Sequence, residues 1–133
     1  MIKNKENIIE YFKSGIKKSN KIKIGVEHEK FIFDNKTNRR INYSTTVKMF
    51  NQLYEFGWKP VFENQNIIAL SKGDRNITLE PGNQIELAGA KLNNIHEACA
   101  ESYEYLFELK QVLEKLDLRI ISSGFDPIRS EEH

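Results

Sequence analysis

Apolar and polar side chains alternate along residues 22–33 with the two-residue period of a β-strand. Ile24 and Val26 fall on one side of this strand. Glu27 and Glu29 fall on the other side, because residues two positions apart share a face. The pattern predicts a half-buried strand whose outer face carries two carboxylates.

A second alternating stretch predicts a β-hairpin. Residues 76–80 and 84–88 are separated by a Pro-Gly-Asn turn at residues 81–83. If Glu80 pairs with Gln84 across this turn, the polar side chains share one face. That face carries Thr78, Glu80, Gln84 and Glu86, with Thr78 opposite Glu86, and the other face carries Ile77, Leu79, Ile85 and Leu87. Such a sheet is buried on its apolar side and offers its acidic side for function.

Helical spacing of apolar residues predicts three helices. One covers residues 7–18, and a second begins after Ser44 as N-cap and ends at Gly57. The longest covers residues 94–116, where its first residue and Glu97 resemble a capping box. Its apolar stripe is Ile95, Ala98, Cys99, Ser102, Tyr105, Leu106, Leu109, Val112, Leu113 and Leu116. We expect this stripe to cover the apolar side of the sheet.

Four further short segments have strand-like composition. They are residues 39–43, 58–63, 67–71 and 118–122. Strands grouped together with helices on one side indicate an α+β fold around a largely antiparallel sheet, forming a single domain over residues 1–133.

Composition narrows the possible partners and location. Lys and Arg number 20 against 19 Asp and Glu, so no net positive charge favours nucleic acid or an anionic membrane. No apolar run approaches the roughly 18 residues of a membrane span, and the N-terminus lacks the apolar stretch of a signal peptide. Cys99 is the single cysteine, which excludes an internal disulfide and is consistent with a reducing cytosol. These properties predict a soluble cytoplasmic protein.

The acidic pairs are the candidate chemistry. Carboxylates two residues apart on a strand lie roughly 7 Å apart and repel each other by about 2 kcal/mol at an effective dielectric constant near 20. Hard oxygen ligands without accompanying cysteines suit Mg²⁺ or Mn²⁺, which bridge protein carboxylates to nucleotide phosphates. The alternative, equally supported by the spacing, is a solvated face whose glutamates pair with Lys and Arg.

Other conspicuous side chains favour structural interpretations. His28 falls on the face opposite Glu27 and Glu29, which predicts a core histidine hydrogen-bonded beneath the sheet. Lys30 is expected to form a structural ion pair. Cys99 is expected to be a small buried hydrophobe, and Trp58 is expected in the core. The basic residues expected to be solvated in turns, rather than facing phosphate, are Arg39, Arg40, Lys72 and Arg75.

Four separated strings of this sequence resemble the N-terminal part of glutamate–cysteine ligase of the plant and proteobacterial type. They are residues 24–31 around Glu27-His28-Glu29-Lys30, residues 77–90 around Glu80-Pro81-Gly82-Asn83-Gln84, His96-Glu97-Ala98-Cys99-Ala100-Glu101, and Gly124-Phe125-Asp126-Pro127. Asn83 stands where that family usually has glycine, Ala88 where serine is common, and Lys91 where proline usually follows.

The resemblance implies a fold and an activity. The fold is a curved antiparallel sheet with helices on one face, part of a catalytic core similar to that of glutamine synthetase. The activity is ATP-dependent phosphorylation of the glutamate γ-carboxylate, followed by attack of the cysteine amine to give γ-glutamylcysteine, the first step of glutathione biosynthesis. Carried over by position, the metal ligands for Mg²⁺ or Mn²⁺ are Glu27, Glu29, Glu80 and Glu86. Gln84 is expected to be a substrate-binding residue or a residue that supports a metal ligand.

Two alternatives stay open at this stage. Because family members continue well beyond position 133, the chain is also consistent with a non-catalytic fragment or binding module that retains only the metal face. A related ligase with another amine acceptor is the second alternative. An incomplete sheet also leaves an unpaired edge, so self-association of the isolated chain is expected.

Overall fold

The computed structural model describes residues 4–125, which form an α+β fold. Its helices are α1 (Lys5–Ser14), α2 (Tyr43–Leu53) and α3 (Ile95–Leu116), with short 3₁₀ turns at Ser19–Lys21, Tyr54–Phe56 and Pro81–Asn83. Its strands are β1 (Glu27–Asp34), β2 (Lys59–Glu63), β3 (Asn66–Lys72), β4 (Arg75–Glu80), β5 (Gln84–Ala88) and β6 (Leu118–Ile121). Within the described residues the strands form one antiparallel sheet in the order β2-β3-β4-β5-β1-β6, which confirms the predicted fold class.

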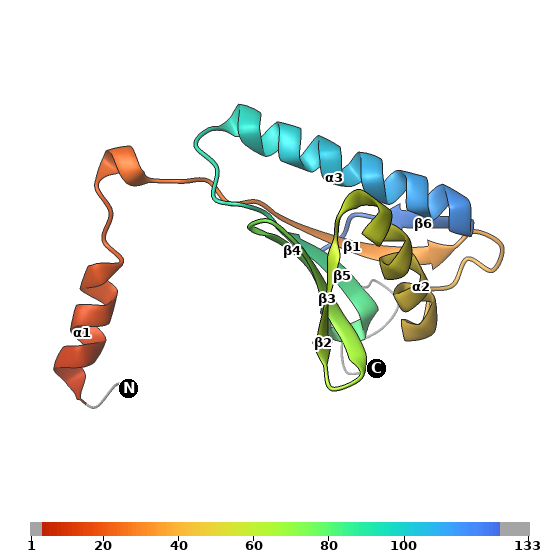
Figure 1. Ribbon diagram of the computed structural model, residues 1–133, viewed down its shortest axis with the longest axis horizontal. Coiled ribbons are helices and arrows are strands. Elements are labelled where there is room, and N and C mark those ends of the chain that lie inside the picture. Colours follow the sequence, from red (N-terminus) through yellow and green to blue (C-terminus); the bar gives the residue numbers. More distant parts are fainter. Residues whose placement is uncertain (1–3, 126–133) are drawn as a thin grey trace.

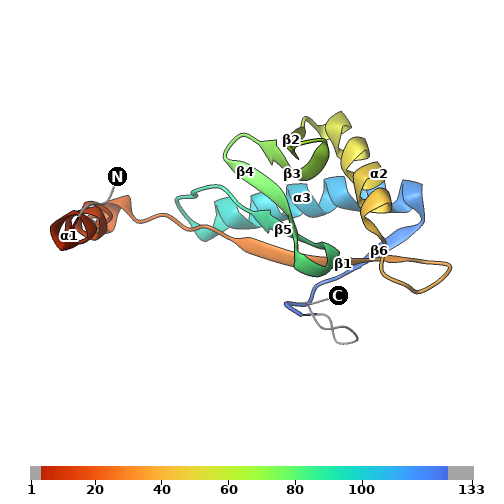
Figure 2. The ribbon, with the colours of Figure 1, turned by 90° about the horizontal axis from the view of Figure 1, so that it is seen from below.

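Helices α2 and α3 cover one face of this sheet, and α1 stands apart from it at the end of an extended segment (Figures 1 and 2). The core lies between the sheet and the two covering helices. Its most deeply buried large side chains are Trp58, Tyr105, Phe50, Ile32, Met49, Leu53, Leu70, Ile77, Ile85, Leu87, Leu109 and Val112. The opposite face carries no helix within residues 4–125, and this is the face to which the acidic side chains belong.

The predicted hairpin has the predicted register. Glu80 pairs with Gln84, and Thr78 pairs with Glu86. The turn residue Asn83 has a positive φ of 62°, a conformation that glycine adopts without steric cost. The family that this sequence resembles usually has glycine at this position. Asparagine can replace it because asparagine is one of the few other residues that tolerate a positive φ.

Helix α1 is displaced from its predicted bounds by its caps. The side chain of Asn4 accepts a hydrogen bond from the backbone N–H of Asn7, so the helix begins at Lys5 and not at residue 7. It ends before Gly15. None of its side chains is buried, although Ile8 and Phe12 are apolar. No helix in the described chain is long and apolar enough to cross a membrane.

The N-cap predicted for the second helix was wrong. Asn42 caps α2, and its side-chain oxygen accepts from the backbone N–H of Thr45 at 3.0 Å. Ser44 lies inside the helix and donates its hydroxyl to the same Asn42 oxygen. The strand predicted over residues 39–43 is reduced to one bridge, Phe33 with Arg40, because Tyr43 already begins the helix.

Asn94 is the N-cap of α3 as predicted, and its side-chain oxygen accepts from the Glu97 backbone N–H at 3.0 Å. Glu97 accepts in return from the Asn94 side-chain amide and from the Asn93 backbone N–H, one residue before the donor of a standard capping box. The predicted stripe was wrong at three positions that are exposed, namely Ile95, Cys99 and Leu106. Instead, Glu101 and Glu108 face the sheet and are buried. The predicted stripe left these two residues out because they are charged. In the fold both carboxylates accept hydrogen bonds beneath the sheet, which makes their burial possible.

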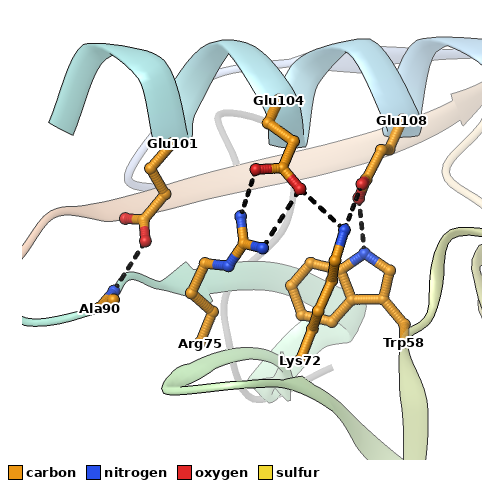
Figure 3. Close-up of polar contacts among 7 residues, drawn as sticks. All are labelled: Trp58, Lys72, Arg75, Ala90, Glu101, Glu104 and Glu108. Atoms are coloured by element: carbon orange, nitrogen blue, oxygen red, sulfur yellow. Dashed lines mark hydrogen bonds and ion pairs between the residues drawn. The ribbon is translucent and has the colours of Figure 1, made fainter. Parts of the chain in front are cut away.

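A polar network joins α3 to the sheet (Figure 3). Glu108 accepts from the Trp58 indole N–H at 2.7 Å and also binds Lys72. Glu104 binds Lys72 and Arg75, and these hydrogen bonds, the one from Arg75 foremost, lower the pKa of Glu104 to about 2. The expectation that Lys72 and Arg75 are solvated turn residues was therefore wrong, because both point from the sheet toward the helix.

Candidate metal- and substrate-binding face

The sequence-predicted site residues lie on three adjacent strands, β4, β5 and β1. Glu29 of β1 is the direct partner of Glu86, which is in turn the partner of Thr78 on β4. Directly opposed residues of an antiparallel pair point to the same face of the sheet. The two acidic stretches, 57 positions apart between Glu29 and Glu86 (86 minus 29), thus meet on one surface.

Hydrogen bonds organise this face. The Gln84 side-chain amide donates to Glu29 Oε2 at 3.3 Å and to the backbone carbonyl of Ser123 at 3.1 Å. The Thr78 hydroxyl donates to Glu80 Oε1 at 2.7 Å. Gln84 is buried, so its amide holds the Glu29 carboxylate and the segment after β6 in a defined arrangement.

The acidic face concentrates negative charge. The pKa of Glu86 is raised, first by burial and then by repulsion from Glu27, Glu80 and Glu29. Within residues 4–125 none of these four carboxylates forms an ion pair with Lys or Arg. The described chain therefore lacks the basic partners that the alternative of a solvated, ion-paired face requires.

The donors suit Mg²⁺ without forming a closed cage. In the described part of the chain, no group of three or more His, Cys, Asp or Glu side chains is arranged to hold a metal ion. Mg²⁺ is typically bound by one or two carboxylates together with phosphate oxygens and water, and not by protein ligands alone. The opposed pair Glu29 and Glu86, with Glu27 and Glu80 beside it, fits that pattern of ligation.

Side chains on the opposite face of β1 have structural contacts. His28 Nε2 lies 2.9 Å from the Ser102 hydroxyl of α3, which confirms a histidine hydrogen-bonded beneath the sheet. Burial and the charge of Lys30 lower the pKa of His28. Lys30 is itself buried and donates to the Ser122 hydroxyl at 3.1 Å. The predicted ion pair of Lys30 was wrong within residues 4–125, where a hydroxyl takes the place of a carboxylate.

One residue at the margin of the acidic face was not predicted. The Arg40 guanidinium lies 4.4 Å from the centre of the Phe31 ring, and Phe31 shares the face of Glu29. Arg40 is half-buried beside Gly82 of the hairpin turn and is not a fully solvated turn residue. Phe31 lies two residues after Glu29, so strand periodicity places its ring on the acidic face. Periodicity does not reveal which residue covers the ring.

Comparison with known proteins assigns the family. The profile of the glutamate-cysteine ligase family 2 matches residues 23–133. The chain belongs to this family. It is 41% identical over 124 residues to the chloroplastic glutamate–cysteine ligase of Nicotiana tabacum, covering 92% of this chain and 24% of that protein. It is 40% identical to the Arabidopsis thaliana enzyme, with the same coverage, and to glutamate–cysteine ligase A of Oryza sativa subsp. japonica, of which it covers 25%.

The family assignment confirms the resemblance and corrects one expectation. The chain spans about a quarter of the length of these glutamate–cysteine ligases. All three are named as chloroplastic enzymes, which contradicts the cytoplasmic location predicted here. That prediction failed because a single cysteine and a polar N-terminus do not distinguish one reducing compartment from another. Residues 126 and 127 of the fourth string lie outside the described residues.

Proposed function

We propose that this chain supplies the acidic metal-binding face of an ATP- and Mg²⁺-dependent ligase that forms γ-glutamylcysteine from glutamate and cysteine. Membership of the glutamate–cysteine ligase family supports the reaction class. The opposed carboxylates of Glu29 and Glu86 carry the proposal for the metal, because the described chain gives their charge no basic partner. Mn²⁺ suits the same oxygen ligands.

The residues divide into two roles in this proposal. Glu27, Glu29, Glu80 and Glu86 would hold Mg²⁺, which when bound neutralises phosphate charge and helps to position ATP for phosphoryl transfer. Gln84 holds Glu29 through its amide and keeps its carbonyl oxygen as an acceptor, suited to the ammonium group of an amino-acid substrate. Thr78 orients Glu80 in the same manner.

Neutralising the proposed ligands tests this function. In the full natural polypeptide that contains this chain, Glu27→Gln and Glu86→Gln are each expected to lower Mg²⁺-dependent γ-glutamylcysteine formation at least about 100-fold, since ligand carboxylates are lost. The matched control is Glu63→Gln, an exposed glutamate of β2 outside the acidic face. Phosphate release and γ-glutamylcysteine are both measured. Unchanged turnover in the two ligand variants would refute the proposed role.

We further propose that the 133 residues alone bind the metal without catalysing ligation, because they span about a quarter of the length of the related ligases. Incubation of this chain with ATP, Mg²⁺, glutamate and cysteine is expected to release no phosphate above a blank without protein. Turnover by the isolated chain would contradict this. A competition assay, in which the full polypeptide is offered cysteine together with other amino acids as substrates, identifies the amine acceptor.

A further inference from the structure

Two of the three strands that carry the acidic face, β1 and β5, end in an irregular pairing. Glu27 is the partner of Ala88, but the next bridge joins Ile24 to Leu92. Two residues on the β1 side, 25 and 26, therefore lie opposite three on the β5 side, 89–91. This is the arrangement of a β-bulge, in which one extra residue interrupts the ladder and redirects neighbouring side chains.

Glu101 of α3 binds the backbone of this bulge (Figure 3). Its Oε2 accepts a hydrogen bond from the Ala90 backbone N–H at 3.0 Å. The Glu101 side chain is buried, and its second oxygen, Oε1, has no hydrogen-bond partner within residues 4–125. A buried carboxylate with one oxygen unpartnered is costly. The one hydrogen bond that the Glu101 carboxylate accepts within residues 4–125 is the one from the bulge.

Gly89 shows how closely the bulge is packed. A Cβ added at this residue would lie 2.9 Å from the Val26 carbonyl oxygen and closer still to Glu101 Oε1. The Gly89 N–H donates to that same Val26 carbonyl at 2.8 Å. The backbone at position 89 is thus enclosed between β1 and the Glu101 carboxylate, and any side chain there would displace one of them.

We propose that Glu101 is a positioning residue that sets the relative placement of the Glu27 and Glu86 carboxylates by holding the bulge. The bulge starts one residue after Ala88, the partner of Glu27, and three residues after Glu86. Glu101 reaches it from the helix side of the sheet and binds only backbone there. This proposal rests on the proposed function, because the placement matters for metal ligation.

The test has two readouts in the full natural polypeptide. Electron paramagnetic resonance measures the affinity for Mn²⁺, and hydrogen exchange measures the protection of the Ala90 amide. Glu101→Ala is expected to weaken Mn²⁺ binding about tenfold, as loss of a group supporting metal ligands does, and to accelerate Ala90 exchange. Glu101→Gln retains a carbonyl acceptor and is expected to keep Mn²⁺ affinity within about twofold. The matched control is Glu104→Ala, on the same helix but bound to Lys72 and Arg75, which is expected to leave both readouts unchanged.

A second variant keeps the proposal testable if Glu101→Ala does not fold. Gly89→Ala is expected to weaken Mn²⁺ binding to a similar degree, because its methyl group would clash with the Glu101 carboxylate and with the Val26 carbonyl of β1. The effects of Gly89→Ala and Glu101→Ala are expected to be less than additive in the double variant, since the carboxylate is then absent. Full additivity in Mn²⁺ affinity would count against the coupling of the two residues.

The outcomes separate this proposal from the proposed function. Unchanged Mn²⁺ affinity in Glu101→Ala and Gly89→Ala would overturn the positioning role, whether or not Ala90 exchange changes. Ligation is measured separately in the unmodified polypeptide. Absent ligation with intact Mn²⁺ binding would refute the ligase proposal and leave the positioning of the carboxylates supported. Absent Mn²⁺ binding by the unmodified polypeptide would refute both proposals.

Discussion

The electrostatic environment of a strand residue depends on which distant residues share its face of the sheet. Glu86 is the clearest case, because its burial and three carboxylates contributed by β1 and β4 raise its pKa. Glu27 and Glu29 are more exposed than Glu86 and Glu80, so the acidic face becomes less accessible toward the hairpin. Repulsion of this kind is tolerated in a protein when a bound cation relieves it.

Substitution of Glu86 tests this electrostatic interpretation without reference to catalysis. A raised native pKa means that the native state binds the proton at a higher pH than the unfolded chain, so the repulsion is present above the native pKa and disappears as the pH falls through it. Without added metal, Glu86→Gln is expected to increase the free energy of unfolding at neutral pH by less than about 1 kcal/mol, since water screens the group. Below about pH 4 the two proteins should have equal stability.

Urea denaturation at the two pH values measures this difference, with Glu63→Gln on β2 as the control. Mg²⁺ is expected to stabilise the unmodified protein more than Glu86→Gln. Destabilisation by Glu86→Gln at neutral pH in the absence of metal would contradict the interpretation.

At the scale of elements, caps and buried polar contacts decide where helices begin and which face they bury. Asn42 and Ser44 both have side chains that cap helices, and only the structure shows that Asn42 does so. Helix α3 similarly combines an apolar face with two buried glutamates. Both features depend on contacts with neighbouring groups that local composition does not specify.

Asn42→Ala is expected to destabilise the protein by about 1 kcal/mol, because the Thr45 N–H loses its side-chain acceptor. Ser44→Ala is the matched control and should cost only a few tenths of a kcal/mol, since it removes one exposed hydroxyl. Thermal unfolding followed by circular dichroism compares the two variants. Equal effects would show that Ser44 shares the capping role.

Glu108→Ala is expected to destabilise the protein by about 3 kcal/mol, because it leaves the Trp58 N–H and the Lys72 ammonium without their buried carboxylate. Glu114→Ala on the same helix is the control. Glu114 forms only a 3.8 Å pair with Lys110, and both side chains are largely exposed, so its loss should cost less than about 0.5 kcal/mol. Urea denaturation, monitored by Trp58 fluorescence, measures the stability of both variants. Similar unfolding midpoints would contradict the stabilising role of the Glu108 contacts.

At the scale of the whole molecule, β2 and β6 are the two edge strands of the described sheet. Apolar side chains are exposed on the outer strand β2, where Phe62 is 55% exposed, and on α1, which packs against nothing within residues 4–125. Outer strands with apolar surface tend to pair with other chains.

The isolated 133-residue chain is therefore expected to self-associate, with a mass above that of the monomer in size-exclusion chromatography with light scattering. Phe62→Lys should shift it toward the monomer, because a charged lysine on an outer strand opposes pairing. Tyr103→Lys, which changes an exposed aromatic side chain of α3 and none on an edge strand, is the control. A single monomeric species of the unmodified chain at high concentration would contradict this prediction.

The sequence alone determined the local periodicities of this protein and their consequences. Strand parity placed Glu27 with Glu29, and the hairpin turn placed Glu80 with Gln84 and Thr78 with Glu86, because a side-chain period of two leaves one arrangement with a buried apolar face. Family motifs added the membership of the glutamate–cysteine ligase family.

The tertiary structure alone decided which distant groups meet. The pairing of β1 with β5 brings Glu29 opposite Glu86, and packing of α3 buries Glu101 and Glu108 against partners more than ten residues away in sequence. Neither follows from periodicity, because a polar residue is stable in the interior only when folding supplies its hydrogen-bond partner.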